Sequence, residues 1–285
     1  MTKVAIVTDS TANIPTELLK KYPVFTAPLQ VLWDEKVYLD GIDIDPKGFY
    51  ERLSQSKTMP STSQVTPSAF LTLYEDLLRD GYEILSIHIS QKLSGTLDSA
   101  VQAKAQLPGS RIELFDSETT AMAMGFHVLS AARAAAMGAS LDECVELAKK
   151  ARAHTGVLFT ANTLEFLHRG GRIGGGAKFL GTALNLKPIL EMRDGRIEAV
   201  ERVRNIGKAL DRMLELSIRR MGDRTPIRLA TIHANDPENA EMLLQKARNH
   251  FNVSDVSETY ISEVSPTIGT HTGPGTVGIA FMAGM

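Results

Sequence analysis

The first half of the chain alternates short apolar runs with helical segments, and this rhythm is the feature that most limits the possible folds. The β-branched runs cover residues 4–8, 82–89 and 111–115, and a hydroxyl-rich turn and then a helical segment follow each run. Such β-turn-α repetition is typical of a mostly parallel sheet with helices on both faces. The sequence therefore predicts an α/β fold.

Helix starts are marked in two further places by capping residues. Thr66 precedes Pro67, a pair that is typical of an N-cap followed by the first helical position. Ser140 and Glu143 have the spacing of a capping box, in which the two side chains satisfy free backbone N–H groups. We therefore expect one helix to begin at Pro67 and another to cover residues 141–153.

The second half has a different order of elements. A strand over 156–160 is followed by a glycine-dense stretch and then by two strand-like runs joined by an Asp-Gly turn, which predicts a β-hairpin. The remaining expected elements are helices 206–221 and 237–249 and strands 227–233, 255–262 and 276–282. Because about 150 residues is a common domain size, 285 residues agree with two domains or one large one. We place them at 1–155 and 156–285, both of the α/β class.

Composition excludes several classes of protein. There are 31 Lys and Arg against 33 Asp and Glu, so the chain lacks the basic surplus of nucleic-acid or anionic-membrane binding proteins. The single cysteine, Cys144, excludes an internal disulfide and a cysteine-built zinc site. The start of the chain turns polar after four apolar residues, unlike a signal peptide. The longest apolar region, 121–139, contains His127 and Arg133 and does not suit a bilayer, so we expect a cytoplasmic protein.

Hydroxyl-rich turns recur where strands are followed by helices, at residues 8–11, 61–64, 90–96 and 116–120. Ligands of open α/β sheets lie beyond the carboxyl ends of the strands, where helix N-termini offer free N–H groups to anions. Helix capping alone explains any single turn of this kind. Several turns at one sheet edge favour a site for a carboxylate or a phosphate.

Catalytic and metal-binding motifs find little support. Ser94 lacks the Gly-x-Ser-x-Gly context of a nucleophile, and the seven histidines show no His-Glu-x-x-His spacing. The stretch 174–178 lacks the Gly-Lys-Ser/Thr ending of a phosphate loop. The stretch 273–278 matches Gly-x-Gly-x-x-Gly, but only seven residues follow it, so we expect a turn. We therefore predict no catalytic residue and no metal site.

Several weak motifs acquire specificity from their order and spacing along the chain. They are Thr-Asp-Ser-Thr-Ala at 8–12, Thr-Ser-Gln at 62–64, Leu-Ser-Gly-Thr at 93–96, Gly-Gly-Arg-Ile at 170–173 and His-Thr-Gly-Pro-Gly-Thr-Val-Gly at 271–278. With these motifs the chain resembles, nearly from end to end, the DegV family of bacterial fatty-acid-binding proteins.

The resemblance implies a long-chain fatty acid, such as palmitate, bound between two α/β domains. It implies that hydroxyls at Thr62 and Ser94 hold the carboxylate, with His271 nearby. Family members are carriers without chemistry or cofactor of their own, which present the acid to a separate fatty acid kinase. The kinase makes an acyl phosphate for phospholipid synthesis. Arg204 matches a kinase-facing position of the family, with Arg202 as the alternative.

Two hypotheses remain beside this interpretation. A histidine at the head group would be cationic when the acid is bound. The rival function is phosphoryl transfer, because the family's first domain is similar in architecture to part of the dihydroxyacetone kinases. That reaction would need paired carboxylates for magnesium, for which Asp9 and Asp116 are the candidates.

Overall fold

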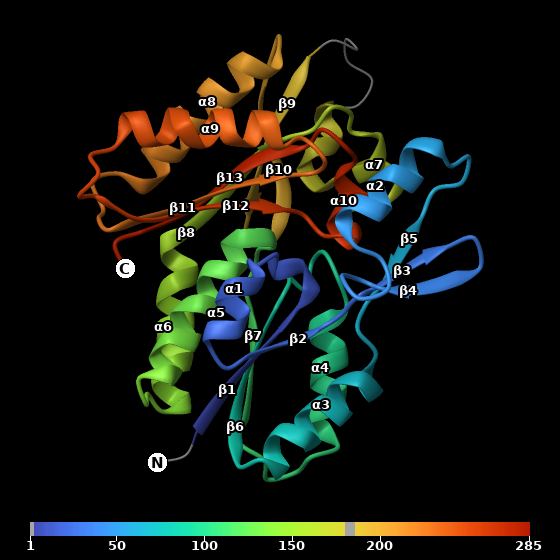
Figure 1. The fold of residues 1–285 in the computed structure, drawn as a ribbon, viewed down its shortest axis with the longest axis vertical. Coiled ribbons are helices and arrows are strands. Elements are labelled where there is room, and N and C mark those ends of the chain that lie inside the picture. The colour runs from blue at the N-terminus through green and yellow to red at the C-terminus, as the bar shows by residue number, and fades with distance from the viewer. Residues whose placement is uncertain (1–2, 180–185) are drawn as a thin grey trace.

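The computed structural model in Figure 1 describes residues 3–179 and 186–285. Its first half contains a four-stranded sheet of order β2-β1-β6-β7, in which all neighbouring strands are parallel. The strands are β1 (Lys3–Asp9), β2 (Val24–Ala27), β6 (Tyr82–His88) and β7 (Ile112–Asp116). Strand β1 is buried along nearly its whole length, as expected where helices cover both faces. The predicted parallel α/β arrangement is confirmed.

Helices cover both faces of this sheet. On one face lie α3 and α4, and on the other lie α5 and α6. The helices of this half are α1 (Thr16–Lys21), α2 (Pro46–Gln55), α3 (Pro67–Arg79), α4 (Thr96–Ala105), α5 (Ala121–Ala136) and α6 (Leu141–His154), with a 3-10 turn at Ser10–Ala12. Thr66 caps α3, and Ser140 with Glu143 forms the predicted capping box at α6. The two predictions from capping residues are therefore confirmed.

A small antiparallel sheet, which the sequence analysis did not anticipate, projects from the first half. Its order is β4-β3-β5, from strands β3 (Gln30–Trp33), β4 (Lys36–Leu39) and β5 (Ser61–Ser63). The buried ring of Trp33 packs edge-on against Phe49 of α2, with the ring centroids 5.5 Å apart. This contact ties the small sheet to the neighbouring helix.

The second half is built on a six-stranded mixed sheet of order β10-β9-β8-β13-β11-β12. The strands are β8 (Thr155–Thr160), β9 (Lys187–Arg193), β10 (Arg196–Val203), β11 (Ile227–His233), β12 (Val256–Glu263) and β13 (Val277–Ala283). The helices are α7 (Glu165–Arg169), α8 (Ile206–Met221), α9 (Pro237–His250) and α10 (Pro266–Thr272), with a 3-10 segment at Gly174–Phe179. Strand β8 is the first strand along the chain that belongs to this second sheet. The division of the chain into domains 1–155 and 156–285 stays a proposal.

Helix α5 lies between the two sheets. It contacts β1 and β6 of the first sheet and β8, β11 and β13 of the second. Its alanine- and methionine-rich sequence is buried on nearly all sides, which is typical of a helix inside a large core. The opposite face of the second sheet is covered by α8 and α9. A single apolar layer therefore joins the halves.

Polar contacts also cross the seam between the halves. The β9–β10 hairpin turns at Asp194 and Gly195, both with positive φ, as an Asp-Gly hairpin turn requires. Its backbone carbonyls accept hydrogen bonds from the first half: Ser90 Oγ donates to Gly195 O at 2.8 Å, and Lys92 Nζ donates to Asp194 O at 2.7 Å. The predicted hairpin is confirmed, and its turn packs against the loop that follows β6.

The capping box at α6 provides a test of this fold. Replacing Ser140 by alanine removes the hydroxyl that accepts from the Glu143 amide. We expect Ser140→Ala to lower the free energy of unfolding by about 1 kcal/mol in urea denaturation. Ser140→Thr, which keeps a capping hydroxyl, is the control and should stay within about 0.5 kcal/mol of the parent. Equal stability of all three proteins would contradict the assignment.

Candidate functional site

A cavity of ≈ 190 Å³ lies where the two halves meet. Most of its wall is apolar and comes from both halves of the chain. Representative side chains are those of Leu29, Ile89, Val157, Phe159, Met192 and Ile232. Such a wall suits a long hydrocarbon chain.

The three residues that the resemblance singled out line this same cavity. They come from β5, from the loop between β6 and α4, and from α10. Thr62 Oγ1 lies 2.7 Å from His271 Nε2, although the two residues are 209 positions apart. Ser94 Oγ lies 2.9 Å from Thr96 Oγ1 and accepts from the Thr96 amide at 3.3 Å. The fold therefore brings Thr62, Ser94 and His271 into one cavity, and their role toward a ligand stays a prediction.

Arg172 hydrogen-bonds to the backbone beside Ser94 and to Gly170, which lies against the His271 ring. Its Nε donates to Leu93 O at 2.9 Å, next to Ser94, and its Nη1 donates to Gly170 O at 2.6 Å. The side chain is half-buried and lines the cavity. The sequence analysis quoted this arginine within a motif but gave it no role. Its position adds a positive charge to the hydroxyls and the imidazole.

Gly170 is required for the position of His271. A Cβ atom at residue 170 would collide with the His271 ring. Any larger residue there would displace the imidazole from Thr62. The glycine of the Gly-Gly-Arg-Ile motif is thus explained by close packing in the site.

The environment of His271 keeps its ring neutral. Burial, followed by the positive charge of Arg172, lowers the pKa of His271 from 6.5 to about 4. The ring is therefore uncharged near pH 7 in the protein as it stands. Its Nδ1 is buried and has no hydrogen-bond partner among residues 3–179 and 186–285. A cationic His271, as hypothesised from the sequence, requires an added negative charge beside it.

The two candidates for a partner-facing arginine lie in different surroundings. Arg204 follows β10 and is exposed. Arg202 is half-buried, and its guanidinium lies over the ring of Phe179, 4.7 Å from the ring centroid. Arg204 is therefore the freer of the two, and its role stays a prediction.

The two carboxylates that phosphoryl transfer would need both accept hydrogen bonds from backbone amides. Asp9 is fully buried and accepts from the amides of Thr11 and Ile89. Asp116 accepts from the amides of Gln91 and Glu118. Across the described ranges, no group of three or more His, Cys, Asp or Glu side chains is arranged to hold a metal ion. Asp9 and Asp116 are thus already hydrogen-bonded to the backbone of the chain, and phosphoryl transfer stays an untested alternative.

Within residues 3–179 and 186–285, no helix combines the length and the apolar composition that a membrane span requires.

Comparison with known proteins gives matches over the whole chain. The family described as uncharacterised protein, DegV family, matches residues 3–284. A DegV domain-containing protein of Streptomyces coelicolor is 36% identical over 277 residues, covering 97% of each chain.

Two solved structures extend the comparison. A fatty-acid-binding DegV family protein of Thermus thermophilus superposes with a TM-score of 0.93 at 35% identity, covering 99% of each chain. The fatty acid binding protein DegV of Bacillus subtilis gives a TM-score of 0.89 at 34% identity, covering 99% of this chain and 100% of that one. From the match over residues 3–284 and these relatives, the chain belongs to the DegV family.

Proposed function

We propose that this protein binds one long-chain fatty acid, such as palmitate, in the cavity between its halves and presents the carboxylate to a separate fatty acid kinase. The observation that carries the proposal is that Thr62, Ser94 and His271 lie together in a mostly apolar cavity. Solved relatives that are described as fatty acid binding proteins support it. The protein acts in the cytoplasm as a carrier, without cofactor or reaction of its own, and the kinase converts the presented acid to an acyl phosphate for phospholipid synthesis.

The apolar wall supplies most of the affinity. A saturated chain with about 14 buried methylenes gains roughly 11 kcal/mol before the costs of binding, at about 0.8 kcal/mol for each methylene. A hydrogen bond to a charged group contributes only about 1.5–3 kcal/mol. The polar residues therefore orient the acid and keep its carboxylate from being buried without donors, which would be costly.

Hydroxyl donors suit a carrier that binds two different head groups in turn. Thr62 and Ser94 can donate to a carboxylate and then to an acyl phosphate, since neither group requires a fixed bidentate partner. Arg172 reaches the same region and would offset the extra negative charge of the phosphate. On the surface, exposed Arg204 is the residue that we propose faces the kinase.

Identification of a co-purified ligand tests the proposal directly. We expect solvent extracts of the protein from a bacterial host to contain a long-chain fatty acid, detected by mass spectrometry in about equimolar amount. A thermal-shift comparison of palmitate with ATP and magnesium separates the carrier from the phosphoryl-transfer enzyme. Stabilisation by the nucleotide alone, with extracts free of fatty acid, would overturn the carrier function.

Removal of the two hydroxyls tests the head-group assignment. We expect the double variant Thr62→Ala with Ser94→Ala to fold, and to lose at least about tenfold in transfer by a fatty acid kinase with ATP. The amount of bound lipid should fall less, because the tail supplies most of the affinity. The matched control is Thr62→Ser with Ser94→Thr, which keeps both hydroxyls. Full transfer by the alanine variant would show that the carboxylate is held elsewhere.

The protonation of His271 provides a prediction for pH dependence. The pKa of His271 is about 4 without ligand, and a carboxylate beside the ring raises it, so binding takes up a proton. Affinity for palmitate should therefore fall as the pH rises from 5.5 to 8, by at most about tenfold per unit. Calorimetry in two buffers of different ionisation enthalpy measures the proton uptake. His271→Gln should remove most of it, and a parent protein without uptake would refute a cationic His271.

A further inference from the structure

The turn after β1 contains a motif, Thr-Asp-Ser-Thr-Ala at residues 8–12, to which the proposed function assigns no role. Neither Asp9 nor Ser10 is among the described residues that line the cavity. We propose that Asp9 and Ser10 are positioning residues, which hold Ser94 and His271 in the geometry that binds a carboxylate. This inference rests on the proposed function and adds two residues that do not touch the fatty acid.

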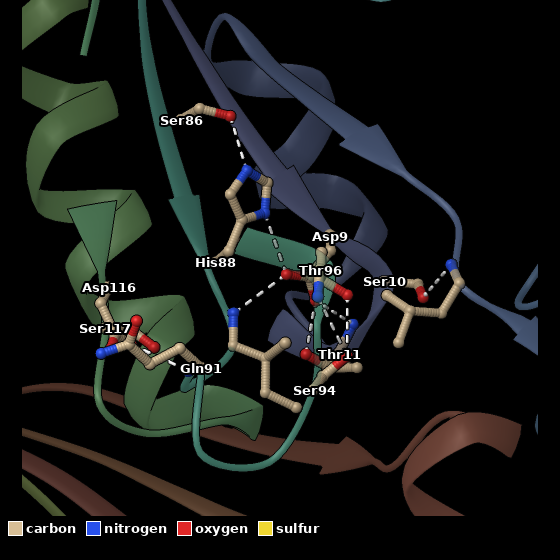
Figure 2. A network of polar contacts seen from close by, with 12 residues as sticks. Asp9, Ser10, Thr11, Ser86, His88, Gln91, Ser94, Thr96, Asp116 and Ser117 are labelled. Atoms are coloured by element: carbon tan, nitrogen blue, oxygen red, sulfur yellow. Dashed lines mark hydrogen bonds and ion pairs between the residues drawn. The ribbon is translucent and has the colours of Figure 1, made fainter. Parts of the chain in front are cut away.

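Asp9 holds the start of the loop that carries Ser94. Its Oδ2 accepts from the Ile89 amide at 3.0 Å, where β6 ends and the loop begins. The Ser94 amide in turn donates to Ser90 O at 3.1 Å, so the loop folds back as a compact turn. Figure 2 shows Asp9 between the end of β6 and Thr11. Asp9 thereby holds the residue that directly precedes the Ser90–Ser94 turn.

The groups that contact the Asp9 carboxylate are buried and hydrogen-bonded to it. The carboxylate is 0% exposed, and Thr11 contributes both its amide, at 3.1 Å, and its hydroxyl, at 2.5 Å. On its other side, His88 Nδ1 lies 3.1 Å from Oδ2, and His88 Nε2 lies 2.6 Å from Ser86 Oγ. The chain of contacts continues to the Tyr74 hydroxyl of α3, at 2.7 Å from Ser86 Oγ. A fully satisfied buried network of this kind fixes geometry.

Ser10 reaches the other side of the cavity through Asp40. Ser10 Oγ donates to Asp40 Oδ2 at 2.6 Å and accepts from the Leu29 amide at 3.1 Å. Asp40 is 2% exposed, and its Oδ1 accepts from the Thr267 amide at 3.3 Å. Thr267 lies in the first turn of α10, and His271 follows four residues later, one helical turn away on the same face. Both residues line the cavity.

Two adjacent residues thus hold in position both Ser94 and His271, the side chains proposed to bind the carboxylate. Asp9 acts within the first half on the Ser94 loop, and Ser10 acts across the seam on the helix that carries His271. The hydroxyl and the imidazole must stay at a distance that matches one carboxylate, because small displacements weaken hydrogen bonds steeply. The turn after β1 therefore sets the selectivity for an acid over an uncharged lipid.

The test compares two ligands with the same tail, palmitate and hexadecanol, on the delipidated full-length protein. We expect Ser10→Ala and Asp40→Ala to weaken palmitate binding about tenfold and to change hexadecanol binding by less than about twofold. Asp40→Asn, which keeps an acceptor for Thr267, should restore part of the loss. The matched control is Asp236→Ala, which removes the helix cap of α9 outside the cavity lining and should leave the ratio of the two affinities unchanged.

A general loss of structure would weaken both ligands equally, and that result would overturn the positioning role. Unchanged palmitate binding by Ser10→Ala and Asp40→Ala would overturn it as well. A parent protein that binds no palmitate would instead refute the proposed function. In that case the NMR signal of the His271 ring, identified by its loss in His271→Gln, tests the positioning role without a ligand. The signal should shift in Ser10→Ala but not in Asp236→Ala. An unshifted resonance would reject the role of Ser10.

Discussion

The hydrogen bond between Thr62 and His271 is the contact on which the site depends. It joins β5 of the small sheet to α10, near the end of the chain, across the seam between the halves. Because a buried carboxylate without donors is unfavourable, an apolar cavity accepts a fatty acid only where such a polar group is built into its wall. Residues of both halves line the apolar space, and this hydrogen bond places polar atoms in its wall, as the proposed binding of an acid requires.

Local patterns in the sequence predicted much of the fold. The β-branched run at 4–8, the capping box at Ser140 and the Asp-Gly turn at 194–195 each specify structure through contacts between near neighbours. The structure confirms all three. The convergence of Thr62, Ser94 and His271 came from the resemblance to a family, because no periodicity relates residues so far apart.

The elements that carry two of these residues were not predicted. Helix α10 contains three threonines and a glycine, which have low helix propensity, and it is stabilised by packing against Phe49 and Tyr50 of α2 at Gly269. Strand β5 has only three residues and no apolar pattern, and its pairing with β3 holds it in place. The position of Arg172 depends on carbonyls of residues 93 and 170, a tertiary arrangement without a local pattern.

The hairpin that meets the Ser90 loop has a consequence for how the protein tolerates change. Its contacts use the main-chain oxygens of residues 194 and 195, so replacing the Asp194 side chain leaves the acceptors in place. Gly195 differs, because a Cβ atom there would press on Ser90 Oγ and the backbone has positive φ. Position 194 therefore accepts other side chains that tolerate positive φ, such as asparagine, whereas position 195 is restricted to glycine.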